Sequence, residues 1–114
     1  MPPVQEERIY KLLSAGQWEA LRENSLFEGS ADDQRDGFIH LSLGSQVSGT
    51  LARHYAQVDG VVLIEVDSEP LGNALVYEPS RNGALFPHLF GVLPLSACTA
   101  VARRKRFDGD WTPL

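Results

Sequence analysis

A histidine followed two residues later by a serine is the feature of this sequence that most suggests a ligand site. The segment Asp36–Ser42 (DGFIHLS) is predicted to be a short strand, in which side chains alternate between two faces. His40 and Ser42 then share one face with Phe38, and the apolar residues between them take the other. A strand made only for packing would not need an imidazole and a hydroxyl on one face. We therefore expect this face to hold a small polar ligand; the alternative is a half-buried histidine bonded to the main chain.

A second histidine, His88, lies in the apolar segment Leu85–Gly91 (LFPHLFG). Proline and glycine interrupt this segment, so we predict an ordered loop with a short strand. Pro87 fixes its own φ angle and favours an extended residue before it, which should hold the His88 ring in one direction. That ring is either bonded internally or turned toward a pocket, and we expect it at the mouth of the same cleft as His40. The apolar residues expected to be buried are Phe86 and either Leu89 or Phe90.

A carboxylate, a guanidinium and an amide follow one another shortly before this loop. Glu78 precedes Pro79, so its backbone is predicted to be extended, and Arg81 and Asn82 come next in a turn. The planar fork of Arg81 can bind a phosphate or a carboxylate through two hydrogen bonds. The alternative is an ordinary surface turn.

The sequence does not predict a metal site or a disulfide. The three histidines, His40, His54 and His88, are far apart and no local H-x-x-x-H pair exists. Cys98 is the single cysteine and lies in an apolar stretch, which favours a buried, unreactive thiol. The glycine-rich segment Gly44–Thr50 lacks the lysine of a phosphate-binding loop.

Composition restricts the class of protein further. A chain of 114 residues with 43% hydrophobic residues suits one domain, here 1–114, with residues 1–7 frayed. The net charge of −5 argues against general nucleic-acid binding, which needs lysine and arginine to neutralise phosphates. No apolar run reaches the roughly 18 residues of a membrane span, and the N-terminus has no leader pattern. We expect a cytoplasmic protein that does not bind membranes.

The order of predicted elements favours an α+β fold. Ser14 is a candidate N-cap for the first helix, and Ser45 for a second helix that Gly60 would close. Val61–Val66 is nearly continuous β-branched and apolar sequence, which is typical of a central strand covered on both faces. The remaining predicted segments are a strand at 8–13, a helix at 15–24, a loop at 25–35, and strands at 74–78 and 98–104.

Two blocks of sequence carry a resemblance to a known family. The first is Asp36–Ser42 together with Gln46, and the second runs from Tyr77-Glu78 through Arg81 to the segment Leu85–Gly91. Both resemble the bacterial family catalogued as domain of unknown function 952. The resemblance covers almost the whole chain, from about Ile9 to Gly109, and both blocks are specific to that family.

The resemblance implies an ADP-ribosyltransferase-like fold, a split and mostly antiparallel sheet around an NAD-binding cleft. A more distant similarity to tRNA 2′-phosphotransferases, which share this fold and use NAD, points the same way. By that similarity His40 would lie on the second core strand. The chain departs from the pattern at Lys11, which follows Tyr10 where the family usually has histidine. A lysine there can still bind a phosphate or a ribose hydroxyl.

We therefore expect a protein that binds NAD, ADP-ribose or a related nucleotide or phosphate ester, with ADP-ribosyl transfer as the implied chemistry. The alternative is a non-catalytic binding or interaction domain that kept the fold and lost the reaction, which the Lys11 departure favours. No protein partner is predicted. The catalytic candidates are His40, His88 and Glu78, and the ligand-binding candidates are Lys11, Ser42, Arg81, Phe86 and Phe90.

Overall fold

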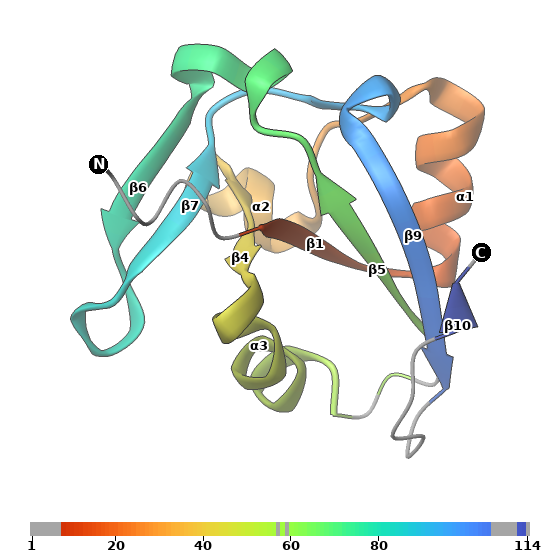
Figure 1. Ribbon diagram of the computed structural model, residues 1–114, viewed down its shortest axis with the longest axis horizontal. Coiled ribbons are helices and arrows are strands. Elements are labelled where there is room, and N and C mark those ends of the chain that lie inside the picture. The colour runs from red at the N-terminus through yellow and green to blue at the C-terminus, as the bar shows by residue number, and fades with distance from the viewer. Residues whose placement is uncertain (1–7, 57, 59, 106–111, 114) are drawn as a thin grey trace.

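The strand predicted to be central lies in the middle of a five-stranded antiparallel sheet. The computed structural model describes residues 8–56, 58, 60–105 and 112–113. The prediction for residues 1–7 lies outside them. In this sheet β5 (Gly60–Val66) pairs with β1 (Ile9–Ser14) on one side and with β9 (Cys98–Lys105) on the other (Figure 1). The outer strands are β4 (Ser42–Leu43) and β10 (Thr112–Pro113).

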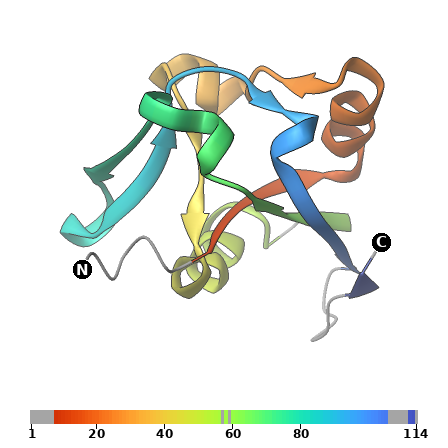
Figure 2. The ribbon, with the colours of Figure 1, turned by 45° about the horizontal axis from the view of Figure 1, so that its top comes forward.

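Two smaller sheets complete the strand pairing. β7 (Leu85–Leu89) lies between β3 (Ile39–His40) and β6 (Leu75–Pro79), and β2 (Leu26–Phe27) pairs with β8 (Leu93–Pro94). Figure 2 shows β6 and β7 on the opposite side of the molecule from β9. All the described strand pairs are antiparallel, so the fold is α+β as the sequence predicted. Short 3-10 turns lie at Gly44–Gln46, Glu69–Ala74, Arg81–Gly83 and Leu95–Ala97.

The segment that carries His40 connects the two larger sheets. β3 pairs with β7, the chain leaves that sheet at Leu41, and β4 then pairs with β1. The Leu41 N–H donates to the Pro87 carbonyl at 3.1 Å, which holds this crossing against β7. The segment is therefore extended from Ile39 onward, as predicted. The prediction was wrong for Asp36, which ends a helix, and for Gly37, whose left-handed backbone caps that helix.

That helix, α2 (Ala31–Asp36), replaces the predicted loop over 25–35, which also contains β2. Ser30 is the N-cap, and a capping box joins it to Asp33. Gly37 ends the helix with a φ of 88°, a left-handed conformation that glycine adopts without strain. The loop prediction failed because the six residues of α2, all polar except Ala31, carry no apolar stripe, so only the caps indicate a helix.

The other two helices cover opposite faces of the five-stranded sheet. α1 (Ala15–Asn24) forms as predicted, with Ser14 and Gln17 in a capping box, and it buries Trp18 and Leu21 in the main core. Burying a side chain of this size contributes about 1.5–3 kcal/mol. On the other face α3 (Val47–His54) packs Leu51 in a second apolar cluster.

The predicted second helix was too long at both ends. Ser45 lies in a 3-10 turn and is not the N-cap of α3, because Gln46 occupies that position without a side-chain hydrogen bond. Gly60 begins β5 and does not end the helix. The apolar spacing continues past the end of α3 at His54, so the sequence alone does not show where the helix ends.

The apolar segment before Gly91 is a full strand, β7, where we predicted a loop with a short strand. It is the central strand of its sheet, so Phe86 and Leu89 are buried. Phe90 follows the strand and is 45% exposed. No helix within the described residues is both long and apolar enough to span a membrane.

Candidate functional site

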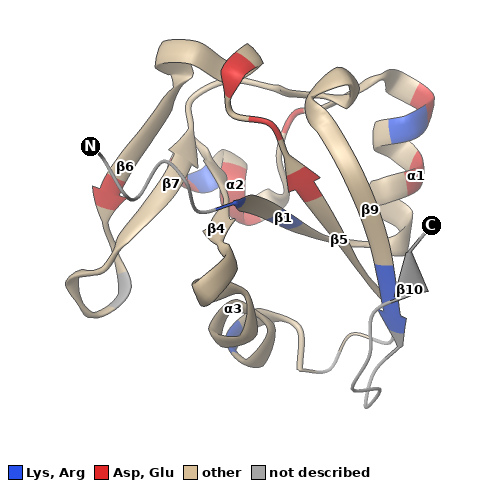
Figure 3. Cartoon of the chain, in the orientation of Figure 1, with Lys and Arg blue, Asp and Glu red and all other residues tan. Residues whose placement is uncertain are grey.

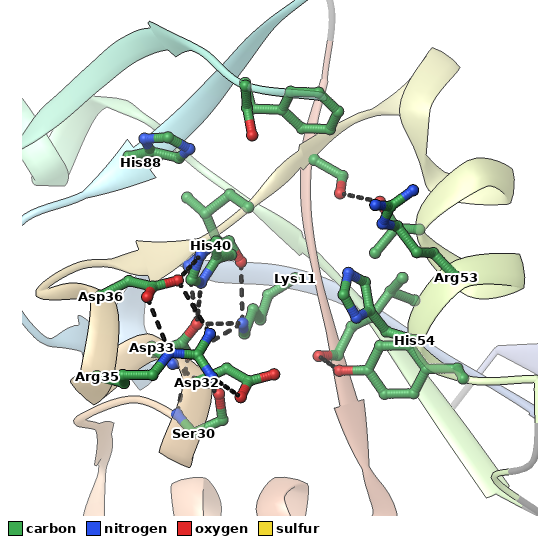
Figure 4. A pocket seen from close by; sticks show the side chains of 17 residues that line it. Lys11, Ser30, Asp32, Asp33, Arg35, Asp36, His40, Arg53, His54 and His88 are labelled. Carbon is green, nitrogen blue, oxygen red and sulfur yellow. Dashed lines mark hydrogen bonds and ion pairs between the residues drawn. The ribbon is translucent and has the colours of Figure 1, made fainter. Parts of the chain in front are cut away.

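A cavity of about 330 Å³ lies where α2 and α3 face the strands that carry His40 and His88. Its walls come from β1, α2, the segment from β3 to β4, α3 and β7. Figure 4 shows the acidic residues of α2 on one side of the cavity and Arg53 and His54 of α3 on the other. Segments far apart in the sequence therefore build one concave site.

The carboxylate of Asp33 is the most highly connected group at this site, and the side chain is only 2% exposed. Its Oδ1 accepts from the main-chain nitrogen of His40 at 3.1 Å and lies 2.6 Å from the His40 Nδ1. Its Oδ2 accepts from the Ser30 N–H at 2.9 Å and from Lys11 Nζ at 3.1 Å. A buried carboxylate with this many donors is held in its ionised form.

Electrostatics at Asp33 and Lys11 follow from burial and pairing. Burial alone would raise the pKa of Asp33, but the hydrogen bond from His40 and the charge of Lys11 outweigh it. The main-chain N–H groups of Ser30 and His40 add to them and hold that pKa well below its ordinary value near 3.8. Burial lowers the pKa of Lys11, and the attraction of Asp33 offsets only part of this effect. The pair is an ion pair enclosed in protein.

The Lys11 ammonium bonds mainly to other groups of the protein. Besides Asp33, its ammonium donates to the His40 carbonyl at 2.9 Å, and its side chain is 6% exposed. With a longer contact to Asp33 Oδ1 at 3.5 Å, these bonds occupy all three donors of the ammonium, although the side chain lines the cavity.

The His40 ring lies between two carboxylates of α2. Its Nδ1 faces Asp33, and its Nε2 lies 3.0 Å from Asp36 Oδ2. Asp36 is also bound by Arg35, whose hydrogen bond and charge lower the pKa of Asp36. Arg35 in turn reaches Asp32, so the exposed side of α2 carries alternating charges (Figure 3). The imidazole of His40 is 39% exposed and lines the cavity.

His88 has a similar arrangement on the neighbouring strand. Its Nδ1 lies 2.7 Å from Glu78 Oε1, and the side chain is 6% exposed. The Phe38 ring stacks on the His88 ring at 3.9 Å and also contacts His40 at 4.6 Å. Glu78 does not line the cavity itself and reaches it through His88.

The wall formed by β4 and α3 supplies hydroxyl groups and a cation. Ser42 Oγ lies 3.0 Å from Thr50 Oγ1, which also donates to the Gln46 carbonyl at 3.2 Å. Arg53 lines the cavity, is exposed, and forms no ion pair with any residue that the structure describes. Burial, with the charges of Asp33 and Asp32, raises the pKa of Tyr55 to about 12, so its hydroxyl stays protonated and donates to the Leu12 carbonyl.

Most residues singled out in the sequence come together here, but not all. Lys11, His40, Ser42, Phe86 and His88 line the cavity. Phe90 lies outside the lining and contacts Phe38 at 5.3 Å between ring centroids. Arg81 begins a 3-10 turn, and its side chain lies outside the described part of the structure.

Sequence reasoning missed the acidic side of the site. Asp33 and Asp36 were placed in a loop and at a strand end, and Arg53 was not considered. The Ser30-x-x-Asp33 spacing, followed by Gly37 after the last turn, was the available signal for α2 and hence for a fixed Asp33. Arg53 had no comparable signal. Within the described residues no group of three or more histidine, cysteine, aspartate or glutamate side chains is placed to hold a metal ion.

Comparison with known proteins places the chain in a family. Residues 12–101 match the family described as "Protein of unknown function (DUF952)". The chain is 45% identical to protein CC0527 from Caulobacter crescentus in its crystal structure, with a TM-score of 0.84 over 94% of this chain and 93% of that one. The solution NMR structure of the same protein gives 44% identity and a TM-score of 0.73, over 93% and 90% of the two chains. No curated protein matches significantly. The chain therefore belongs to the DUF952 family.

Proposed function

We propose that the cavity binds a nucleotide or a related phosphate ester, with NAD and ADP-ribose as the first candidates. The observation that carries this proposal is the convergence of His40, Ser42, Phe86 and His88 on one cavity that Arg53 also lines, and no described residue forms an ion pair with Arg53. A concave site with a few converging polar groups and one aromatic side chain is the usual form of a small-molecule site.

The volume of the cavity restricts the size of the ligand. At about 330 Å³ it is near the lower end of the roughly 300–1,000 Å³ range of ligand pockets. A cavity of this volume suits a mononucleotide, or one half of NAD or ADP-ribose while the other half lies outside the cavity.

The lining suggests which group contacts which part of the ligand. Arg53 would bind a phosphate through its planar fork. The hydroxyls of Ser42 and Thr50, 3.0 Å apart, would bind ribose hydroxyls next to His40. Phe86, from β7, would stack on a base.

The arrangement of the sheets is consistent with an ADP-ribosyltransferase-like fold. Two antiparallel sheets, joined where the chain crosses at Leu41, lie next to a cavity that holds the predicted ligand residues. In ADP-ribosyl transfer the ribosyl centre becomes positively charged, and the Asp36 carboxylate beside His40 would stabilise it. His40 or His88 would then orient the acceptor, with Glu78 acting through His88.

One observation favours the second candidate, a binding domain without catalysis. Lys11 stands where the resemblance leads us to expect histidine, and it is engaged by Asp33 and by the His40 carbonyl. In that case the same cavity binds a ligand or partner, and the protein catalyses no reaction on it.

Ligand-detected NMR with NAD, ADP-ribose and AMP tests the proposal. We expect at least one of the three to bind, and a saturating ligand at a hundred times Kd to stabilise the fold by about 2.7 kcal/mol. Arg53→Gln should weaken binding about tenfold or more, because a hydrogen bond to a charged group is worth about 1.5–3 kcal/mol.

Arg22→Gln is the matched control for this substitution. Arg22 is also an exposed helical arginine, but it lies on α1, away from the cavity, and its partner is Glu19. Its loss should leave affinity unchanged. If none of the three ligands perturbs a resonance at millimolar concentration, the nucleotide proposal is wrong.

A further inference from the structure

His40 and His88 are opposite one another in the structure and are oriented in the same way. They form a directly paired position between β3 and β7, and their ring centroids are 5.9 Å apart. Each ring has its Nδ1 within 2.7 Å of a carboxylate, Asp33 for His40 and Glu78 for His88. In Figure 4 the two rings lie one above the other at the same side of the cavity. A carboxylate on Nδ1 fixes a proton there and leaves Nε2 for chemistry.

The two rings differ at Nε2. In His40 this nitrogen also faces a carboxylate oxygen, that of Asp36 at 3.0 Å. When both nitrogens of His40 carry protons, the ring has a donor directed at each of these two carboxylates. In His88 no described residue bonds Nε2, so with the proton on Nδ1 this nitrogen has a free lone pair. The surroundings therefore suit His40 to give a proton from Nε2 and suit His88 to accept one there.

We propose that His40 and His88 form a general acid and general base pair acting on a ribonucleotide phosphodiester. This inference rests on the proposed function, since the phosphate ester must enter the same cavity. Nicotinamide leaves NAD as a neutral ring and needs no proton. A phosphodiester that breaks to release an alcohol needs one proton removed from the attacking hydroxyl and one delivered to the leaving oxygen, which is what this pair supplies.

The step balances as follows. His88 Nε2 takes the proton of the ribose 2′-hydroxyl while the 2′-oxygen forms a bond to phosphorus. The bond from phosphorus to the 5′-oxygen of the next nucleotide breaks, and that oxygen takes the Nε2 proton of His40. The products are a 2′,3′-cyclic phosphate and a free 5′-hydroxyl, and the step leaves His88 protonated and His40 neutral.

The surroundings allow a substrate to reach the His40 proton. The leaving oxygen would replace Asp36 at His40 Nε2, and Asp36 would keep its partner Arg35, 3.0 Å away. Asp33 is neutralised by Lys11, so it does not present an uncompensated charge to a phosphate. Arg53, across the cavity, is free to bind the phosphate oxygens.

The first test locates the protons on the ring nitrogens of His40 and His88. Nitrogen-15 spectra should place the proton of the neutral ring on Nδ1 in both His40 and His88, which leaves Nε2 to exchange a proton with the substrate. Glu78 is a positioning residue, so Glu78→Ala should turn His88 into a mixture of tautomers without changing His40. A proton on Nε2 in the neutral form of either ring would overturn the assignment.

The second test uses the sixteen ribodinucleoside monophosphates and their 2′-O-methyl analogues, with products identified by mass spectrometry. We expect cyclic phosphates from the former only, and a loss of roughly 10²- to 10⁴-fold in His40→Ala and in His88→Ala. Arg22→Gln, on α1 and outside the cavity, should lose less than tenfold.

The outcomes separate the two proposals. If the analogues bind but no ribodinucleotide is cleaved, the acid–base inference is wrong and the proposed function stands. If neither set binds at millimolar concentration while NAD, ADP-ribose and AMP also fail, both are wrong. Cleavage of the 2′-O-methyl analogues at the same rate would also overturn the inference, because it would not use the 2′-hydroxyl.

Discussion

Asp33 accepts hydrogen bonds from both the ring and the main chain of His40. Its Oδ1 lies 2.6 Å from the ring Nδ1 and 3.1 Å from the main-chain nitrogen. One carboxylate on α2 therefore fixes both the position of β3 and the direction of the histidine on it. Lys11, from the neighbouring sheet, neutralises the same carboxylate and binds the carbonyl of His40. The three residues join a helix and two sheets at the edge of the cavity.

Asp33→Asn should destabilise the protein strongly. The asparagine has nearly the same shape but leaves the Lys11 ammonium, 5% exposed as a residue, without its counter-charge. Removing one partner of a buried ion pair costs about 3–5 kcal/mol. Urea unfolding followed by circular dichroism measures the loss.

Asp32→Asn is the matched control, because Asp32 is the adjacent residue on α2 and, among the residues that the structure describes, forms an ion pair only with the exposed Arg35. A surface pair is worth about 0–1 kcal/mol, so this variant should unfold close to the wild type. Equal losses of unfolding free energy in the two variants would show that the buried ion pair stabilises the fold no more than the exposed one.

The stability contributed by Asp33 should disappear in acid. A carboxyl group whose pKa is lower in the folded than in the unfolded state contributes stability above the unfolded pKa, and the contribution is lost as pH falls toward the folded pKa. The folded pKa of Asp33 lies well below 3.8. The difference in unfolding free energy between wild type and Asp33→Asn should therefore be constant near neutrality and shrink as pH falls from about 5 to 2. A difference that does not change over this range would contradict the pairing.

The elements that could be predicted from sequence are those with a local signal. The apolar run from Val61 to Val66 predicted a central strand, and Ser14 predicted the start of α1, because burial and capping act on neighbouring residues. α2 has six residues and no apolar stripe, so its polar composition predicted a loop, although Ser30 and Gly37 cap the helix. Without that helix no local pattern predicts that Asp33 lies beside His40.

The candidate site was predictable only in part for a similar reason. His40 and His88 were recognised from the two motif blocks, and their shared cavity followed from the expectation that both blocks form one site. Their pairing with Asp33 and Glu78 depends on strand register and on the position of α2, which no local pattern encodes. Lys11 was predicted to contact the ligand because it follows Tyr10, where the resemblance leads us to expect histidine. The alternation of β1 puts it on the face of Ile9 and Leu13, and this explains its burial.

Cys98 should react slowly with thiol reagents in the folded protein. Burial raises the pKa of this thiol to about 11, and its Sγ lies 3.7 Å from the Pro94 carbonyl. The reactive thiolate is therefore scarce at pH 8. Colour development with a disulfide reagent at pH 8 should be slow in buffer and rapid in denaturing urea. Fast reaction in buffer would show that the thiol is accessible and more acidic than its surroundings imply.

Ser30→Ala should disturb the His40 ring as well as the stability of α2. The Ser30 hydroxyl accepts from the Asp33 N–H at 3.1 Å, and the Ser30 N–H donates to Asp33 Oδ2 at 2.9 Å. Losing an N-cap costs about 0.5–2 kcal/mol, and here the loosened residue is the one that orients His40. Ser14→Ala removes the matching capping box of α1, which has no contact with the cavity. Both variants should lose similar stability in urea, but only Ser30→Ala should shift the His40 ring resonances in NMR. A shift of the same size in Ser14→Ala would show that the His40 ring responds to general loosening of the fold, and the specific link through Asp33 would then be wrong.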